Sequence, residues 1–331
     1  MYKALDTRYK DKKFSYCGNS GLKLPPVSLG MWHNFGDSAD FRTIKDICFT
    51  AFDNGVTHFD LANNYGPMPG SAESNFGKIL STDFKPYRDE LIISSKAGFD
   101  MWDGPYGKGG SRKYLMASLN QSLKRLQLDY VDIFYHHCMD KHTPLEESML
   151  ALADIVRSGK ALYIGLSNYD GVTMQKASKI LNELKVPFII NQNRYNILDR
   201  EIEDNELYDS CEELGKGLII FSPLAQGLLT DRYLKDIPAD SRIVKDGFFL
   251  KEEHLKPELM QKLSKLNDLA ISRGQTLAQM SLAWIYSKKA VTSVLVGASK
   301  VSQLLDNIKM IENTTFTKQE LEQIDNIVYY K

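Results

Sequence analysis

The amino-acid sequence predicts an α/β fold of the TIM-barrel type, a (β/α)8 barrel with an N-terminal β-hairpin and an extra C-terminal helix. Short apolar runs alternate with longer amphipathic segments along almost the whole chain, as in parallel sheets whose strands are joined by crossover helices. The alternation also fits a doubly wound sheet, but the runs number eight, as in the barrel. Neither a linker nor a charge block divides the 331 residues, so one domain over residues 1–331 is expected.

The strands of this fold are expected in the following places. Phe14–Cys17 and Leu22–Leu24, joined by Gly-Asn-Ser-Gly, form a hairpin that covers the N-terminal mouth of the barrel. Many barrel strands are apolar at successive positions, which is typical of strands buried on both faces. These strands are Val27–Gly30, Thr57–Asp60, Leu91–Lys96, Tyr130–His136, Ala161–Leu166, Phe188–Asn191, Leu218–Phe221 and Ser293–Val296.

The helices between the strands are indicated by apolar residues at helical spacing. In Arg112–Leu126, leucines recur at i, i+4, i+8 and i+11 and form one buried stripe. Glu146–Val156 repeats the pattern and ends before Gly159. Thr317, followed three residues later by Glu320, is a capping box that opens a helix beyond the eighth strand.

Composition and charge exclude several classes of protein. The 41 Lys and Arg residues balance 42 Asp and Glu residues, so the chain lacks the basic excess that binds nucleic acid or an anionic membrane surface. Four cysteines lie far apart without a CxxC pair, and the first residues contain no apolar signal core. A cytoplasmic protein without a membrane span is therefore expected.

The common nucleotide and hydrolase motifs are missing from the sequence. The nearest approach to GxGxxG begins at Gly215 and fails at Ile220, and GxxxxGK[ST], GxSxG and HExxH do not occur. A nucleotide would have to be bound in another way.

Polar residues gather where the second, third and fourth predicted strands end. They are Asp60 with Tyr65 just beyond it, Lys96, and His137. In a barrel these ends meet at one mouth. A lysine ammonium there would stabilise a tyrosinate, the aspartate would hold the lysine, and the histidine would donate to a carbonyl oxygen, which suits carbonyl reduction.

Taken singly, each of these residues has a simpler interpretation. An aspartate beside a lysine is often a structural ion pair, and a tyrosine in a Gly/Pro loop is often surface packing. The histidine pair with Asp140 and His142 could hold a metal, but its spacing matches no zinc pattern, so no metal is expected.

Seven segments together give the chain a family resemblance. They are FDLANNYGPMPGSAE, LIISSKAG, YVDIFYHH, GLSNY, INQNRYN, FSPLAQGLL and SVLVGASKVSQLLDNI. From about Leu24 to the final helix the sequence resembles the aldo-keto reductases. It most resembles the branch that contains bacterial L-glyceraldehyde 3-phosphate reductase and, further off, the voltage-gated potassium-channel beta subunits. The resemblance implies a barrel that uses NADPH, with a catalytic tetrad of Asp60, Tyr65, Lys96 and His137.

The same resemblance implies the cofactor contacts. The nicotinamide end would lie against Trp32, Asp60, Ser167, Asn168, Gln192 and Phe221. Ser222, Leu224 and Gln226 match the pyrophosphate loop, with Arg232 and Arg242 as basic partners. The adenosine end would be held by Gly297, Ser299, Lys300, Gln303, Asp306 and Asn307. Amides such as Asn168 and Gln192 are costly to bury without partners, and a helix N-terminus at Ser299 and Lys300 suits a 2′-phosphate.

Small aldehydes are the expected substrates, with triose phosphates or methylglyoxal foremost. His136 and Cys138 depart from the serine and arginine that flank the tetrad histidine in the bacterial reductases, so Arg112 is expected to meet a substrate phosphate instead. The glycine-rich segment 98–111, with Trp102, is expected to cover the mouth.

Two other functions are alternatives to a reductase. They are a cofactor-binding regulatory subunit and a metal-dependent barrel hydrolase. Family analogy adds a homo-oligomer, either a tetramer or an octamer.

Overall fold

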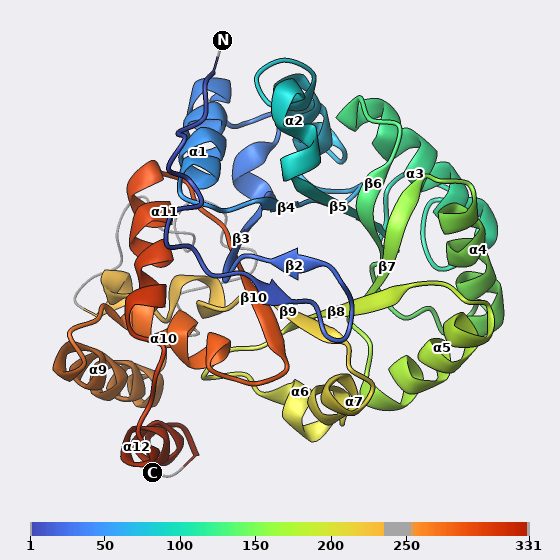
Figure 1. Ribbon diagram of the computed structural model, residues 1–331. Coiled ribbons are helices and arrows are strands. Elements are labelled where there is room, and N and C mark those ends of the chain that lie inside the picture. Colours follow the sequence, from blue (N-terminus) through green and yellow to red (C-terminus); the bar gives the residue numbers. More distant parts are fainter. Residues whose placement is uncertain (1, 235–252, 254, 330–331) are drawn as a thin grey trace.

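The computed structural model describes residues 2–234, 253 and 255–329, and their strands form a closed parallel barrel (Figure 1). The strand order is β10-β3-β4-β5-β6-β7-β8-β9, so the first barrel strand pairs with the last. The barrel strands are β3 (Val27–Gly30), β4 (His58–Asp60), β5 (Ile92–Ala97), β6 (Val131–His136), β7 (Ala161–Ser167), β8 (Phe188–Arg194), β9 (Gly217–Phe221) and β10 (Val291–Val296). The predicted fold class is confirmed.

The largest difference from the predicted strands is at the end of β8. This strand continues past Asn191 to Arg194, because Gln192 and Arg194 still pair with Ile219 and Phe221 of β9. Backbone pairing, rather than apolar side chains, sets the end of the strand. Polar residues are thereby held rigidly at the C-terminal mouth.

Helices surround the barrel and alternate with its strands (Figure 1). The predicted helix Arg112–Leu126 is α3, begun by the Ser111 side chain, which accepts from the Tyr114 N–H. The Thr317–Glu320 capping box is also present before α12, with bonds of 2.6 and 3.2 Å. The helices are α1 (Phe41–Asp53), α2 (Ser71–Ser81), α3, α4 (Leu145–Arg157), α5 (Gly171–Glu183), α6 (Glu201–Asp204), α7 (Leu207–Glu213), α9 (Pro257–Ser272), α10 (Leu277–Tyr286), α11 (Val301–Ile308) and α12 (Lys318–Tyr329).

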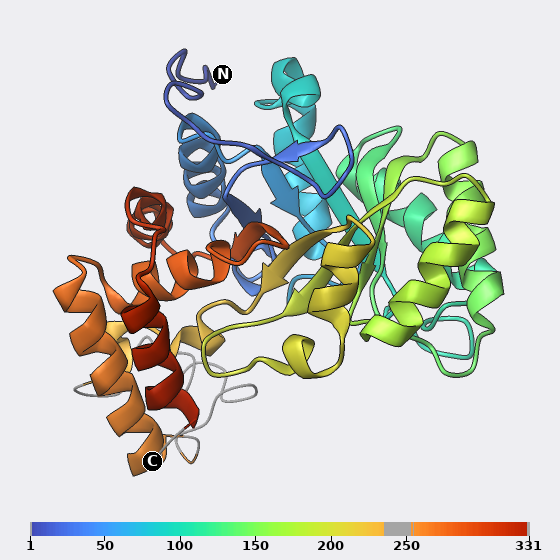
Figure 2. The same ribbon diagram turned by 60° about the horizontal axis from the view of Figure 1, so that its bottom comes forward.

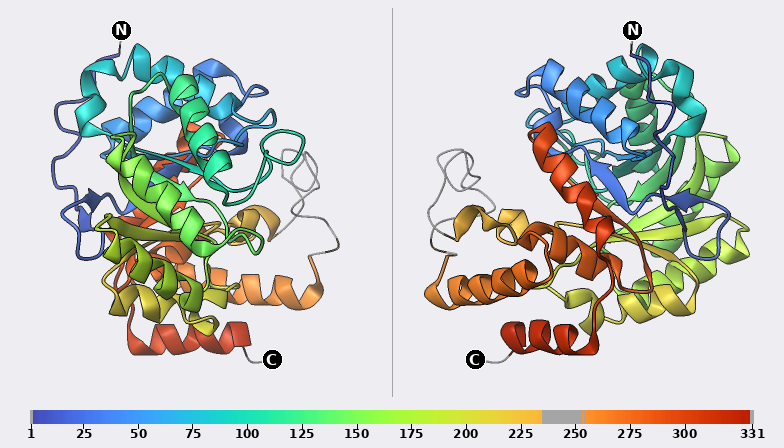
Figure 3. Two further views of the ribbon diagram at one scale, coloured as in Figure 1. Left: turned by 90° about the vertical axis from the view of Figure 1, so that its right-hand side faces the viewer. Right: turned by 60° about the vertical axis from the view of Figure 1, so that its left-hand side comes forward.

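The N-terminal hairpin covers one end of the barrel, as expected. Its strands are β1 (Ser15–Tyr16) and β2 (Lys23–Leu24), and Figure 1 shows them lying across the barrel axis. Cys17 and Leu24 are fully buried in a cluster with inward-facing residues of β6, β8, β9 and β10. In the left view of Figure 3 the hairpin and the loop that follows β5 lie at opposite ends of the barrel.

The last helix, α12, packs against α9 outside the ring of barrel helices. Figure 2 shows the two helices side by side, away from the barrel axis. Within the described part of the chain, no helix is both long enough and apolar enough to cross a membrane.

Candidate active site

Three of the predicted site residues are joined directly inside the C-terminal mouth. The Lys96 ammonium donates to Asp60 Oδ2 at 2.5 Å and to the Leu61 carbonyl at 2.6 Å, and it lies 3.4 Å from the Tyr65 hydroxyl. Both Asp60 and Lys96 are almost completely buried. A buried ammonium is therefore held against a phenol by a buried carboxylate.

The charges in this group shift the pKa values in opposing ways. Burial alone would lower the pKa of Lys96, but the charge of Asp60 and the neighbouring phenol outweigh it, so the pKa is raised and the lysine is charged. Burial raises the pKa of Tyr65, and the Lys96 charge opposes this shift without cancelling it. The phenol therefore keeps its proton at neutral pH.

Asp60 is held by two further side chains. Its Oδ1 accepts from the Ser94 hydroxyl at 2.6 Å and from Gln192 Nε2 at 3.1 Å. Ser94 was not among the predicted site residues. Strand alternation could have identified it, because Ser94 and Lys96 lie two residues apart on β5 and so face the same side of the sheet.

His137 lies directly after β6, beside the phenol. Its ring centroid is 5.9 Å from that of Tyr65. Burial first, and then the charge of Lys96, hold its pKa well below the ordinary value, so the ring is neutral and can donate one hydrogen bond. Its Nδ1 is buried and meets no partner among the described residues.

The residues on either side of His137 differ in exposure. His136 is buried, and its Nδ1 lies 2.6 Å from the Tyr169 hydroxyl. Burial lowers the pKa of His136 to about 4, so this ring is also neutral. Cys138 is partly exposed, and burial raises the pKa of its thiol to about 11, so it is a protonated thiol rather than a reactive thiolate.

Aromatic rings lie around the phenol. Trp32 is 6.5 Å from Tyr65 between ring centroids, and Phe99 stands edge-on to His137 at 4.7 Å. Phe99 was missed by the sequence analysis, although it sits two residues beyond β5. Trp102, in the loop 98–111, packs at 5.1 Å on Tyr114.

The loop 98–111 is fastened to the neighbouring loop by one carboxylate. Asp140 accepts from the Gly110 N–H at 2.8 Å, the His142 N–H at 2.9 Å and the Thr143 hydroxyl at 2.7 Å. Burial would raise the pKa of Asp140, but these hydrogen bonds outweigh it and lower the pKa to about 2. Its contribution to stability is present above the unfolded pKa near 3.8 and is lost as pH falls toward about 2.

Asp140→Asn should loosen the loop 98–111, because the amide nitrogen cannot accept the hydrogen bonds that one carboxylate oxygen accepted. We expect faster amide hydrogen exchange at Gly110 in the variant than in the wild type. Asp103→Asn removes the same charge from an exposed position of the same loop and is the matched control. Equal exchange rates in the two variants would show that Asp140 does not hold the loop.

The Arg112 guanidinium is engaged by a carboxylate outside the predicted active site. It donates to Asp154 of α4 at 2.6 Å, on the outer helical layer, and half of the side chain is exposed there. The expectation that Arg112 meets a substrate phosphate is therefore not supported. Sequence spacing places the residue at the start of α3, but it cannot tell which way a long side chain extends.

The predicted nicotinamide contacts all lie at C-terminal strand ends. Ser167 ends β7, and Asn168 follows it with a left-handed φ of 56°. The Asn168 amide donates to the His137 carbonyl at 2.8 Å, which leaves its own carbonyl oxygen to accept. Gln192 uses its amide nitrogen on Asp60, and Phe221 ends β9.

The segment after β9 has unusual backbone geometry. Ser222, Ala225 and Gln226 all have positive φ values, of 51°, 47° and 61°, which is costly for residues other than glycine. Leu224 and Gln226 both lie within this segment. Arg232 follows in a short 3-10 helix, while Arg242 lies outside the described residues.

The segment after β10 begins α11 without a side-chain cap at its N-cap residue, and other residues of the segment hydrogen-bond to one another. Lys300 is the N-cap residue of α11 and is exposed, and Gln303 Oε1 accepts from the Ser299 N–H and hydroxyl at 2.9 and 3.0 Å. Asp306 is bonded to Gln279 of α10 at 2.7 Å, so its carboxylate faces the protein. The remaining predicted contacts here are Gly297 and Asn307.

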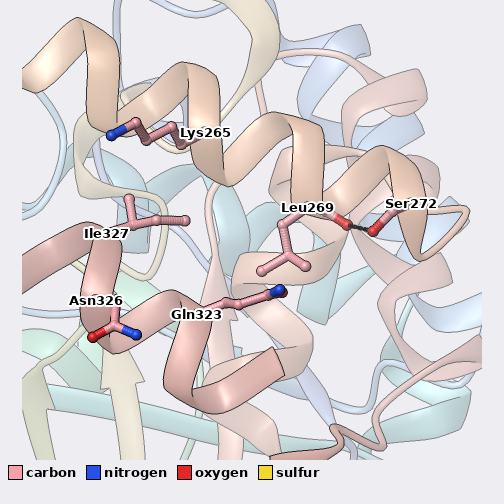
Figure 4. Close-up of a pocket in the computed structure, with 6 residues that line it drawn as sticks. All are labelled: Lys265, Leu269, Ser272, Gln323, Asn326 and Ile327. Atoms are coloured by element: carbon pink, nitrogen blue, oxygen red, sulfur yellow. Dashed lines mark hydrogen bonds between the residues drawn. The ribbon is translucent and has the colours of Figure 1, made fainter. Parts of the chain in front are cut away.

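A cavity of about 440 Å³ lies elsewhere, between α9 and α12 (Figure 4). None of the predicted site residues lines it, and the Ser272 hydroxyl is bonded back to its own helix at Leu269. The lining residues are Lys265, Leu269, Ser272, Gln323, Asn326 and Ile327. Among the residues the structure describes, no group of three or more His, Cys, Asp or Glu side chains could hold a metal ion.

Comparisons with known proteins agree with the barrel fold just described. Residues 26–329 match the Aldo/keto reductase family, and the chain belongs to this family. It is 54% identical to an L-glyceraldehyde 3-phosphate reductase of Escherichia coli O157:H7, over 96% of this chain and 93% of that protein. It is 34% identical to a probable voltage-gated potassium channel subunit beta of Oryza sativa subsp. japonica, over 96% of this chain and 97% of that protein.

Among solved structures, the chain is similar to a thermostable aldo-keto reductase crystallised with the inhibitor epalrestat. The TM-score is 0.75 and the identity 29%, over 95% of this chain and 99% of that one. The chain is thus an aldo-keto reductase, an oxidoreductase of small carbonyl compounds, with a nicotinamide cofactor as in the family.

Proposed function

We propose that the protein reduces small aldehydes to alcohols with NADPH, and that Tyr65 is the proton donor. The observation that carries this proposal is the Lys96 ammonium, fixed by Asp60 and placed 3.4 Å from the Tyr65 hydroxyl. Such a cation stabilises the negative charge that develops on the phenol oxygen as its proton leaves. Neutral His137 beside it can donate to the carbonyl oxygen of the substrate.

The residues around the mouth fit a dinucleotide. The strained turn at 222–226 directly follows β9 at the mouth, and the Asn168 carbonyl can accept from a carboxamide. When bound, NADPH supplies the hydride. The chain itself orients the aldehyde between Tyr65 and His137 and delivers the phenolic proton to the alkoxide oxygen.

The substrate proposal is a small aldehyde, L-glyceraldehyde 3-phosphate or a compound like methylglyoxal. The 54% identical relative is named for the first of these. The aromatic rings of Trp32 and Phe99 beside the phenol favour a compact substrate. A panel of small aldehydes, monitored by NADPH consumption, tests the proposal. If the protein reduced none of them, the proposal would be refuted.

Lys300 is proposed to favour NADPH over NADH through the 2′-phosphate. Lys300→Ala should weaken NADPH binding by about tenfold, as when one charge-assisted hydrogen bond is lost, and NADH binding much less. Fluorescence titration of both cofactors measures the ratio. Lys309→Ala, an exposed lysine just past the other end of α11, is the matched control. Equal weakening of both cofactors would place Lys300 elsewhere.

We further propose that residues 1–331 act as one domain in the cytoplasm and assemble into homo-oligomers, either tetramers or octamers. A single cluster of buried residues that runs from Ala4 to Ile324 supports the single domain. Location and assembly rest on the family resemblance alone. Light scattering of the purified protein measures the assembly.

A further inference from the structure

A continuous line of hydrogen-bonding side chains crosses the barrel interior and ends on Asp60. Ser293 Oγ lies 2.6 Å from Ser28 Oγ, and Ser28 Oγ lies 2.9 Å from His58 Nδ1. His58 Nε2 then lies 3.0 Å from Ser94 Oγ, which donates to Asp60 Oδ1 at 2.6 Å. The line passes through the neighbouring strands β10, β3, β4 and β5, and all five side chains are buried. We call it the interior chain.

The direction of every proton in the interior chain follows from its charged end. An ionised carboxylate only accepts, so the Ser94 hydroxyl proton points to Asp60. Ser94 must then accept from His58, which places the imidazole proton on Nε2 and leaves Nδ1 as an acceptor. Ser28 therefore donates to His58, and Ser293 donates to Ser28 at 2.6 Å, with the Pro26 carbonyl at 3.4 Å as a second, longer acceptor. Each donor reinforces the next in the low dielectric of the core.

The structure assigns to His58 the role of a positioning residue for the proton donor, and we infer that it acts through Ser94 and Asp60. This inference rests on the proposed reduction by Tyr65. With Ser94 and Gln192 on Oδ1 and Lys96 on Oδ2, the carboxylate has one orientation, and the ammonium has one place beside the phenol. Without the imidazole, Ser94 loses the donor that fixes its hydroxyl, so the hydroxyl can rotate away from Asp60. The orientation of the Asp60 carboxylate is then less firmly fixed.

His58 must remain neutral for this role, and its surroundings keep it so. Burial lowers the pKa of His58 to about 4; the charge of Asp60 opposes this shift and that of Lys96 adds to it. Within the described part of the chain, the ionisable groups that face the phenol are Lys96, Asp60 and His137. If the pKa of Tyr65 shifts in a variant that keeps Lys96, Asp60 and His137, the shift is therefore transmitted by the interior chain.

The test compares His58→Leu, which keeps bulk but breaks the chain, with His58→Gln, whose amide can both donate and accept. We expect kcat to fall about tenfold in His58→Leu and to recover in His58→Gln, with unchanged NADPH affinity. In the reverse reaction the phenol must be ionised, so the rise of alcohol oxidation with pH should move to higher pH in His58→Leu. A purely structural role would not be restored by His58→Gln and would not move the pH profile.

Serine variants and magnetic resonance keep the inference testable if His58→Leu does not fold. Ser28→Ala should lower kcat less than His58→Leu does, while Ser178→Ala, a buried serine of α5 outside the chain, should leave kcat unchanged. The imidazole ¹⁵N shifts of His58, assigned by their loss in His58→Gln, should report the Nε2–H tautomer. The Nδ1–H tautomer would overturn the inference. An active wild type whose His58→Leu profile is unshifted would overturn it too, whereas an inactive wild type would refute the proposed function itself.

Discussion

Tyr65→Phe should lower kcat for aldehyde reduction by roughly 10²–10⁴-fold, because it removes the one phenolic proton that Lys96 is placed to help release. The substitution deletes a single oxygen atom. The ring that packs near Trp32 and His137 remains, so the shape of the mouth is kept. NADPH affinity should change little. Steady-state kinetics and a fluorescence titration of NADPH on the same preparation measure both quantities.

Tyr208→Phe is the control for this prediction. It removes a partly buried tyrosine hydroxyl on α7 that accepts from the Ala290 N–H at the opposite end of the barrel. Its kcat should match that of the wild type. A Tyr65→Phe variant that keeps more than half of the wild-type activity would mean that another group supplies the proton.

Lys96→Met should reduce kcat by a similar order, for a different reason. The phenol remains, but the cation that opposes the rise of its pKa is gone, so the pKa of Tyr65 rises further. In the reverse reaction the rise of activity with pH should therefore move to higher pH. The double variant with Tyr65→Phe should lose little more than either single variant, since both residues act on one proton.

Lys96→Met should also destabilise the protein, by about 3–5 kcal/mol, because it leaves the Asp60 carboxylate buried without a counter-charge. Adding Asp60→Asn removes that charge and should restore much of the stability while kcat stays low. Chemical denaturation measures the stability of the single and double variants. If stability and activity returned together, the pair would be structural rather than catalytic.

The sequence was sufficient for the architecture because burial on both faces makes barrel strands apolar. Val27–Gly30 was predicted with its observed ends, and the leucine stripe of Arg112–Leu126 marked α3 at both ends. The end of β8 was missed because Gln192 and Arg194 are polar, and the backbone pairing of both with β9, and of Gln192 with β7 as well, keeps them in the strand. The apolar pattern of a sequence segment reports which residues are buried, whereas the length of a strand also depends on backbone pairing with the neighbouring strand.

Site residues at the ends of neighbouring strands could be predicted from the sequence. Contacts that depend on the path of a loop or on the direction of a long side chain were harder to predict. Asp60 and Lys96 meet because β4 and β5 are neighbours. His58 and Ser94 share faces with them and were overlooked because each also suits an ordinary buried strand. Asp140 was named only in a metal-site alternative that its spacing did not favour, and its role in the loop was missed, although a threonine three residues later is typical of a carboxylate that binds its own loop.

The hairpin that closes the N-terminal mouth has a consequence for how the chain acquires its structure. Cys17 and Leu24 are made long before their buried neighbours Ile189, Ile219 and Leu295. These apolar side chains have nowhere to dock until most of the chain has left the ribosome. Burial of the hairpin is therefore a late event in biosynthesis, after a long interval in which its apolar side chains are open to chaperones and to misassembly.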